Sequence, residues 1–153
     1  MNIEIRPYIA ERIEDVLQFE SDLRKEEDFW GWEIDEDYKK SVAASFADSS
    51  FADSISLLAY ADGRVIGRID SSIISSHFDG STKAYLDWIC VVKSCRHHGV
   101  AQKLLEELRR QLKDRGITTL IALTAANEEA QRFYKNIPDS LMRDIGIWID
   151  IKL

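Results

Sequence analysis

Two stretches with different hydrophobic periodicities lie next to each other in the middle of the chain. Residues 85–92 form a continuous run rich in aromatic and β-branched side chains, which predicts a buried strand. Residues 101–112 place apolar side chains at helical spacing on one face, which predicts an amphipathic helix. These apolar side chains are Ala101, Leu104, Leu105, Leu108 and Leu112. The turn between the two stretches is short and basic and contains Gly99, so we expect a strand, a glycine-bearing turn and a helix in direct succession.

The pattern before this unit predicts strands and helices joined by short turns. The expected elements are, in order, a strand at 3–5, a helix from Ile9 onward, helix and loop over 26–51, and strands at 56–60 and 65–74. The last two strands flank Asp62-Gly63, a dipeptide that favours a tight hairpin turn.

The pattern after the central helix predicts a return to alternating strand and helix. Gly116 ends the helix, because glycine readily adopts the left-handed capping conformation. The following elements are a strand at 117–123, a short helix at 127–135 and a closing strand or strand pair at 141–151. This order predicts an α/β sandwich with a mixed, largely antiparallel twisted sheet flanked by helices. A chain of 153 residues is typical of one domain, so we expect a single domain over 1–153.

The net charge of −7 is unevenly distributed along the chain. Residues 11–53 hold 14 acidic and 5 basic side chains, whereas the rest of the chain holds 13 acidic and 15 basic ones. This balance argues against a nucleic-acid partner, which requires a basic surface. The acidic half is either a surface that attracts a cationic amine or an ordinary solvated surface that keeps the protein soluble.

The sequence also predicts where the protein is located. No apolar stretch approaches the roughly 20 residues needed to span a bilayer, and the first residues lack a secretory signal. The two cysteines, Cys90 and Cys95, provide no disulfide framework. We therefore expect a reduced, cytoplasmic protein with no membrane partner.

The turn at residues 96–101 has the composition of an anion site. The first amides of a helix have no partner within the helix, and the helix dipole adds positive charge where they point. One diphosphate held by several of these amides and by Arg96 would be bound firmly. The alternative is a tight connection in which Gly99 only relieves crowding. The sequence contains neither the Gly-rich loop of P-loop proteins nor the dinucleotide-binding glycine fingerprint.

Two motifs in this region resemble those of the GNAT superfamily of acetyl-CoA-dependent N-acetyltransferases. Arg96, Gly99 and Ala101 match its Arg/Gln-x-x-Gly-x-Gly/Ala signature. Residues 127–134 resemble its Asn-x-x-Ala-x-x-Phe-Tyr element, which follows at the usual distance. The resemblance is specific over residues 85–135, and the order of the elements extends it to the whole chain.

The resemblance implies that the protein uses acetyl-CoA as its cosubstrate. In the family, a splayed central strand pair binds the cofactor, and the backbone of the first of these strands holds the pantetheine arm. The matching positions here are Ile89, Cys90 and Val91, and the Val91 amide is a candidate to polarise the thioester carbonyl. The pyrophosphate would lie against Arg96, His97, His98, Gly99, Val100 and Ala101. Asn127 is expected to contact the cofactor, to cap the short helix, or to do both.

The resemblance also implies a general acid, whereas a base has to be inferred from the residues. Tyr134 matches the tyrosine that protonates the coenzyme A thiolate in the family, and a group of pKa about 10 can supply that proton. Asp87 is a candidate base, because an unpaired carboxylate in an apolar run suits proton abstraction. The alternative role for Asp87 is a structural carboxylate bound to neighbouring donors. Further candidate bases are Glu33, Asp70 and His77.

The acceptor and metal predictions depend on less specific patterns. Trp30 and Trp32, beside Glu33 and other acidic residues, are candidates to bind a cationic substrate. The alternative is that they cover the edge of the core. Cys95, His97 and His98 have poor spacing for a tetrahedral zinc site, so no metal is expected.

The sequence therefore predicts an N-acetyltransferase that acts by direct transfer in a ternary complex, because no activated nucleophile is evident. The expected acceptor is a small cationic amine of the polyamine or aminoglycoside type. The alternatives are a protein or peptide amine, and a coenzyme A-binding sensor without transferase activity. The apolar stretch at 145–149 is either an internal strand or part of a homodimer interface.

Overall fold

The computed structural model describes residues 1–28 and 31–151, and the chain divides into two compact units, 1–121 and 122–153. The helices and strands of the first unit are β1 (Glu4–Pro7), α1 (Ile13–Glu26), α2 (Glu36–Ser45), β2 (Ile55–Ala61), β3 (Arg64–Ser75), β4 (Thr82–Val91) and α3 (Val100–Asp114). Short 3₁₀ helices lie at Ala10–Arg12, Ser49–Phe51 and Lys93–Cys95. β5 (Leu120–Ala122) crosses the sequence boundary between the units, and α4 (Glu128–Lys135) belongs to the second.

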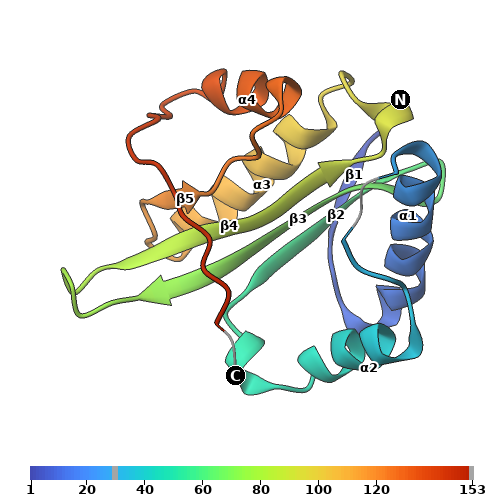
Figure 1. Cartoon of the computed structure of the whole chain (residues 1–153), viewed down its shortest axis with the longest axis horizontal. Coiled ribbons are helices and arrows are strands. Elements are labelled where there is room, and N and C mark those ends of the chain that lie inside the picture. The colour runs from blue at the N-terminus through green and yellow to red at the C-terminus, as the bar shows by residue number, and fades with distance from the viewer. Residues whose placement is uncertain (29–30, 152–153) are drawn as a thin grey trace. The chain divides into compact units, whose positions relative to one another are not determined.

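The strands form one sheet in the order β1-β2-β3-β4-β5 (Figure 1). The first four pair antiparallel, and β5 runs parallel to β4. A parallel pair needs a long crossover connection, which α3 supplies between β4 and β5. The predicted mixed, largely antiparallel sheet flanked by helices is confirmed.

Two of the predicted turns have the expected backbone conformation. Asp62 and Gly63, which join β2 to β3, both have positive φ, 50° and 78°. Such a pair matches the twist of a tight hairpin. Gly116 has φ of 72° and follows the last turn of α3, so the predicted left-handed end of that helix is also confirmed.

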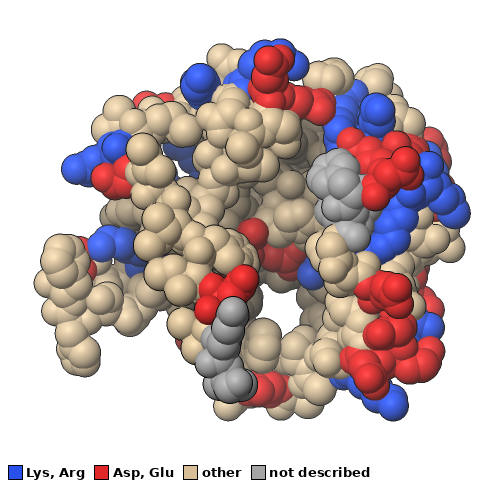
Figure 2. All heavy atoms as spheres, in the orientation of Figure 1, with Lys and Arg blue, Asp and Glu red and all other residues tan. Residues whose placement is uncertain are grey.

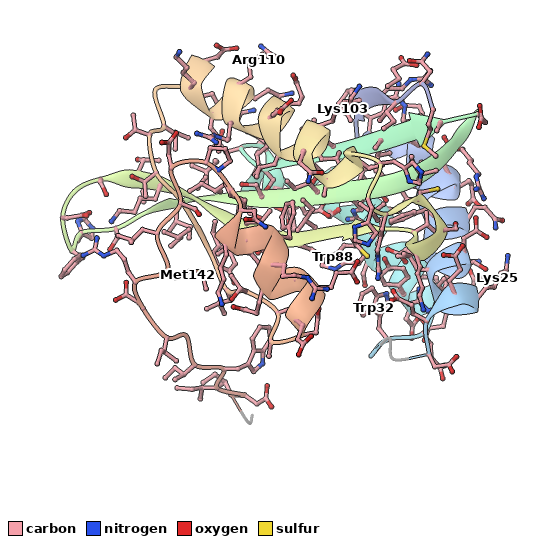
Figure 3. The ribbon with its side chains drawn as sticks, turned by 90° about the horizontal axis from the view of Figure 1, so that it is seen from above. Lys25, Trp32, Trp88, Lys103, Arg110 and Met142 are labelled. Atoms are coloured by element: carbon pink, nitrogen blue, oxygen red, sulfur yellow. The ribbon has the colours of Figure 1, made fainter. Side chains whose placement is uncertain are left out.

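Successive residues of β3 face opposite sides of the sheet. A Cβ atom on Gly67 would lie 2.9 Å from Val100 Cγ1, which places α3 against this face. The next residue, Arg68, lies 3.2 Å from Glu20 of α1 (Nη1 to Oε1). Accordingly, α3 covers one face of the sheet and α1 the other (Figure 3). The buried core includes Leu57, Leu58, Ile66, Ile69, Leu104 and Leu108.

The second unit begins with a capped helix and ends in an irregular segment. The side chain of Asn127 accepts a hydrogen bond from the Ala130 amide at 2.9 Å and caps α4. The predicted closing strand at 141–151 is wrong, since these residues have no regular secondary structure. Their exposed apolar side chains include Ile145, Ile147, Trp148, Ile149 and Ile151. An apolar pattern supplies only a propensity, and a strand also needs a neighbouring edge for its N–H and C=O groups.

Among the described residues, no helix is long and apolar enough to cross a membrane.

Candidate functional site

The turn between β4 and α3 places a run of backbone amides at the start of a helix. The 3₁₀ helix Lys93–Cys95 and residue Arg96 lead into two residues with positive φ, His97 at 62° and Gly99 at 78°. A residue with a side chain is destabilised by about 1–2 kcal/mol at such a positive φ, which explains why position 99 is a glycine. A Cβ atom on Gly99 would meet nothing within 4 Å, so the space beside this backbone is open.

The first amides of α3 point into this turn. The helical hydrogen bonds begin where the Lys103 amide donates to the Gly99 carbonyl at 3.0 Å. The amides of Val100, Ala101 and Gln102 precede this bond and have no partner within the helix. The N-cap residue, Gly99, has no side chain that could cap them. The turn therefore presents several donors and the positive end of a helix dipole, which suits a phosphate group.

The end of β4 turns further backbone groups away from β3. The Val92 amide donates to Ile66 of β3 at 3.0 Å. Successive amides of a strand point to opposite edges, so the amides of Ile89 and Val91 point away from β3. The Val91 carbonyl points the same way and accepts from Arg96 Nε at 3.1 Å. These are the strand positions expected to hold a pantetheine arm, and they directly precede the turn.

The Arg96 side chain is paired with a carboxylate of α1. Its two terminal nitrogens donate to the two Glu27 carboxylate oxygens, at 2.9 and 2.6 Å. Both side chains are largely buried, with 21% and 13% of their surface exposed. A bidentate pair of this kind is among the stronger polar contacts in proteins. Arg96 therefore connects the turn to α1, a contact that the sequence pattern did not predict.

Asp87 occupies a bulge in β4. Asp70 of β3 lies opposite Trp88, whereas the next β3 residue, Ser71, lies opposite Leu86, so Asp87 is the extra residue. The expected burial of Asp87 is wrong: the residue is exposed, next to the buried Leu86. Its carboxylate accepts a hydrogen bond from the Ser72 hydroxyl.

Trp88 lies next to Asp87 and contacts Trp32, which is a candidate to bind the acceptor. The two rings meet edge to face with centroids 5.8 Å apart, and Figure 3 shows them close to each other. Arg24 of α1 holds the Trp32 segment by donating to its carbonyl at 2.9 Å and stacking on its ring at 5.1 Å. Glu33 is exposed beside Trp32. Trp30 lies outside the described residues.

A buried charged cluster lies on the same face of the sheet as Trp88. Arg68 lies between the rings of Tyr8 and Trp88, at 4.8 and 5.5 Å from their centroids. It forms ion pairs with Asp70 at 2.6 Å and with the fully buried Glu20 at 3.2 Å. Neither Glu20 nor Arg68 was singled out from the sequence. The available signal was a glutamate among the apolar positions of α1 and an arginine within an otherwise apolar strand.

Burial raises the pKa of two tyrosine hydroxyls that lie near Glu20. Tyr38 donates to Glu20 at 2.6 Å, and burial together with this bond raises the pKa of Tyr38. Burial also raises the pKa of Tyr8 to about 12. The phenols therefore remain neutral, and the negative charge of this face comes from carboxylates. Figure 2 shows acidic side chains gathered over the neighbouring α2, with basic side chains beside them.

The remaining predicted site residues differ in exposure and reactivity. Burial raises the pKa of the Cys90 thiol to about 12, so little reactive thiolate is present at neutral pH. His97 and His98 are exposed, and His98 Nδ1 lies 2.8 Å from the Arg96 carbonyl. In the second unit, Tyr134 is half-buried and packs edge to face on Phe133. Among the described residues, no group of three or more His, Cys, Asp or Glu is arranged to hold a metal ion.

A scan against protein families matches residues 12–137 to the model described as the acetyltransferase (GNAT) family. This match spans most of the chain and includes the turn, β4 and α4. A search of curated protein sequences finds no significant match.

Similar solved structures share the fold at low sequence identity. An aminoglycoside acetyltransferase from an uncultured soil metagenomic sample superposes with a TM-score of 0.80 at 12% identity, covering 98% of this chain and 97% of that one. An aminoglycoside 6'-N-acetyltransferase from Acinetobacter haemolyticus gives 0.73 at 18% identity, covering 100% and 99%. A ribosomal-protein-alanine N-acetyltransferase from Brucella melitensis gives 0.75 at 14% identity, covering 99% and 100%.

Proposed function

The chain belongs to the acetyltransferase (GNAT) family, and from this premise we propose that it transfers the acetyl group of acetyl-CoA to a small cationic amine. The amine would be of the polyamine or aminoglycoside type. The family match supports the acetyltransferase activity, and the residues around Trp88 support the class of acceptor.

The observation that carries the acceptor proposal is the combination of carboxylates and indole rings on one face of the sheet. The bulge places the exposed Asp87 beside Trp88, and the Trp88 ring contacts Trp32. Carboxylates attract an ammonium group, and an indole face adds about 0.5–2 kcal/mol through the cation–π interaction. The surrounding segment 11–53 carries 14 acidic and only 5 basic side chains, which favours the approach of a cation.

The turn at residues 96–101 fits the diphosphate of the cosubstrate. The open amides at the start of α3 and the free space at Gly99 are what a phosphate group requires. We assign the pyrophosphate to the amides rather than to the Arg96 side chain, because that guanidinium is held by Glu27. The backbone of Ile89 and Val91 would hold the pantetheine arm.

Acetyl-CoA supplies an acetyl group activated as a thioester, and the residues of the chain position the amine and move protons. Asp87 would accept the proton of the incoming ammonium, directly or through water, since its carboxylate is exposed. The Val91 amide would polarise the thioester carbonyl. Tyr134 would donate a proton to the leaving thiolate. The neutral Cys90 thiol favours direct transfer over an acetylated cysteine.

Calorimetric titration with acetyl-CoA, followed by an amine panel, tests this proposal. We expect acetyl-CoA to bind the wild-type protein and to lose affinity in the Gly99→Trp variant, because a bulky side chain at φ of 78° strains and fills the turn. The panel contains spermidine, an aminoglycoside and a peptide with an N-terminal alanine, and release of the coenzyme A thiol is measured. Transfer only to the peptide would show that the acceptor is a peptide amine and not a small cationic amine. Binding without any transfer would favour a coenzyme A-binding sensor.

Variants of the acceptor face then separate binding from chemistry. Trp32→Ala should raise KM for the amine and leave KM for acetyl-CoA unchanged, because Trp32 is assigned to the acceptor alone. Asp87→Asn should lower kcat by about 10²-fold or more, the typical contribution of a general base. Phe78→Ala is the matched aromatic control, since Phe78 is 91% exposed in the β3–β4 turn. An equal effect of Trp32→Ala and Phe78→Ala on KM for the amine would contradict the assignment of Trp32 to acceptor binding.

A further inference from the structure

We infer that Glu26 and Glu27, at the C-terminal end of α1, are positioning residues for the phosphate-binding turn. This inference rests on the proposed function, because the turn is assigned to the pyrophosphate of acetyl-CoA. Neither glutamate would touch the cosubstrate. Each would act through a residue of the segment between β4 and α3, Glu26 through Ser94 and Glu27 through Arg96.

The contacts hold two successive parts of the turn against the same helix end. Glu26 accepts from the Ser94 amide at 2.8 Å and from its hydroxyl at 2.9 Å. Glu27, the C-cap of α1, accepts two hydrogen bonds from Arg96. Arg96 in turn donates to the carbonyl of Val91, the last residue of β4. Two side chains at the C-terminal end of α1 therefore fix the path of the chain from the end of β4 to Arg96.

These contacts fix the first part of the segment between β4 and α3 and leave the start of α3 accessible to a ligand. The polar groups of Ser94 and Arg96 are already used by the two carboxylates, so they are engaged before a phosphate arrives. The amides of Val100, Ala101 and Gln102 precede the first helical bond and are available to a ligand. A site whose donors are fixed in advance loses less conformational entropy on binding. The two carboxylates therefore favour phosphate binding by fixing the turn, although their own charge is negative.

Because the Arg96–Glu27 pair is largely buried, its loss should destabilise the turn. Removal of one partner leaves the other charge without its counter-ion in a poorly solvated place. Glu27→Ala should therefore release the Arg96 side chain and loosen the turn. Glu27→Gln removes the charge but keeps an oxygen that can accept one of the two hydrogen bonds, so its effect should be smaller.

The consequence for kinetics is specific to the phosphate-bearing part of acetyl-CoA. A contact to the pyrophosphate is the same in the ground state and the transition state, and its loss raises KM without lowering kcat. Acetyl-pantetheine carries the same thioester but lacks the pyrophosphate and the nucleotide. A variant that perturbs only the phosphate-binding turn should therefore affect acetyl-CoA and leave acetyl-pantetheine unaffected.

The experiment compares both donors in wild type, Glu27→Ala, Glu27→Gln and Glu26→Gln, with the amine that reacts best in the panel. Glu14→Gln is the matched control, because Glu14 is an exposed acid of the same helix, remote in sequence from its C-terminal end. We expect Glu27→Ala to raise KM for acetyl-CoA at least tenfold with kcat within twofold of wild type. Glu27→Gln and Glu26→Gln should give smaller increases, and Glu14→Gln none. In every variant, kcat/KM for acetyl-pantetheine should stay at the wild-type value.

Three outcomes would overturn the inference, and they can be told apart. An equal loss of kcat/KM with acetyl-CoA and with acetyl-pantetheine would show that the glutamates are general structural residues. Activity retained with acetyl-pantetheine, by contrast, shows that the variant has not simply unfolded. An unchanged KM for acetyl-CoA in Glu27→Ala would show that the turn is fixed without this contact. Failure of the wild-type protein to bind acetyl-CoA in the calorimeter would overturn the proposed function itself and this inference with it.

Discussion

Gly67 of β3 lies so close to Val100, the first residue of α3, that a Cβ atom on the glycine would be 2.9 Å from Val100 Cγ1. The same atom would lie 3.3 Å from the Cys90 carbonyl oxygen of the neighbouring strand. The absence of a side chain at position 67 therefore allows the start of α3 to pack directly on the sheet. Since this helix start carries the open amides, packing at Gly67 determines where the anion site lies.

Gly67→Ala should displace the start of α3 and weaken acetyl-CoA binding. The added methyl group overpacks the contact with Val100, which typically costs about 1–3 kcal/mol. We expect a lower urea midpoint and a weaker calorimetric affinity for acetyl-CoA. Gly31→Ala is the matched control, because a Cβ atom there meets nothing within 4 Å. An affinity for acetyl-CoA equal to that of wild type in Gly67→Ala would show that the helix start tolerates the shift.

Arg68→Ala should destabilise the protein strongly. The change removes the cation that faces the fully buried Glu20 and leaves that carboxylate without its ion pair. Breaking a buried pair in this way costs about 3–5 kcal/mol. Urea unfolding measures the loss of stability. Arg110→Ala is the control, because the Arg110 side chain is 59% exposed and solvent-exposed ion pairs contribute little to stability. Similar losses in the two variants would mean that Glu20 is adequately solvated without Arg68.

Tyr134→Phe should slow acetyl transfer without weakening acetyl-CoA binding. The substitution removes the proton donor assigned to the leaving thiolate and keeps the ring that packs on Phe133. Loss of a general acid typically lowers kcat by 10²–10⁴-fold. Steady-state kinetics give kcat, and calorimetry checks that the affinity for acetyl-CoA is retained. An unchanged kcat would show that another group or water protonates the leaving thiolate.

The free energy of unfolding should fall as the pH rises above about 9. Burial raises the pKa values of Tyr8, Tyr60 and Cys90 to about 12 in the folded protein. Between their unfolded and folded pKa values the native state binds more protons than the unfolded state, so stability decreases with rising pH in this window. Urea unfolding at pH 8 to 11 measures the decrease.

Tyr8→Phe provides the control for this pH dependence. The Tyr8 hydroxyl is buried and, within residues 1–28 and 31–151, has no hydrogen-bond partner, so its removal should cost little at neutral pH. The variant should lose less stability than wild type between pH 9 and 11. An identical decrease in both proteins would show that Tyr8 does not contribute to it.

Local patterns predicted the strand, turn and helix that carry the candidate anion site. The run at 85–92, the glycine in the turn and the leucine spacing after it correspond to β4, the positive φ of Gly99 and α3. The Asp62-Gly63 hairpin was predictable for the same reason. These features depend on neighbouring residues, whose steric preferences act whatever the rest of the chain does.

Patterns failed where an element depends on a distant partner. The apolar run at 141–151 predicted a strand, yet a strand forms only if its backbone finds an edge, and the run itself specifies none. Asp87 lies in an apolar run and was expected to be buried, whereas it is exposed at a bulge in the pairing with β3. The bulge arises from the register between two strands.

The sequence alone determined the elements of this protein and the family motifs they carry. The tertiary structure decided the partners of its charged side chains: Arg96 binds a glutamate 69 residues away, and Arg68 one 48 residues away. Helix and turn formation is governed by steric and hydrogen-bonding preferences over a few residues, which can be read along the chain. An ion pair between distant residues depends on which faces the fold brings together, and any of the 27 acidic side chains satisfies the chemistry of an arginine equally well before folding.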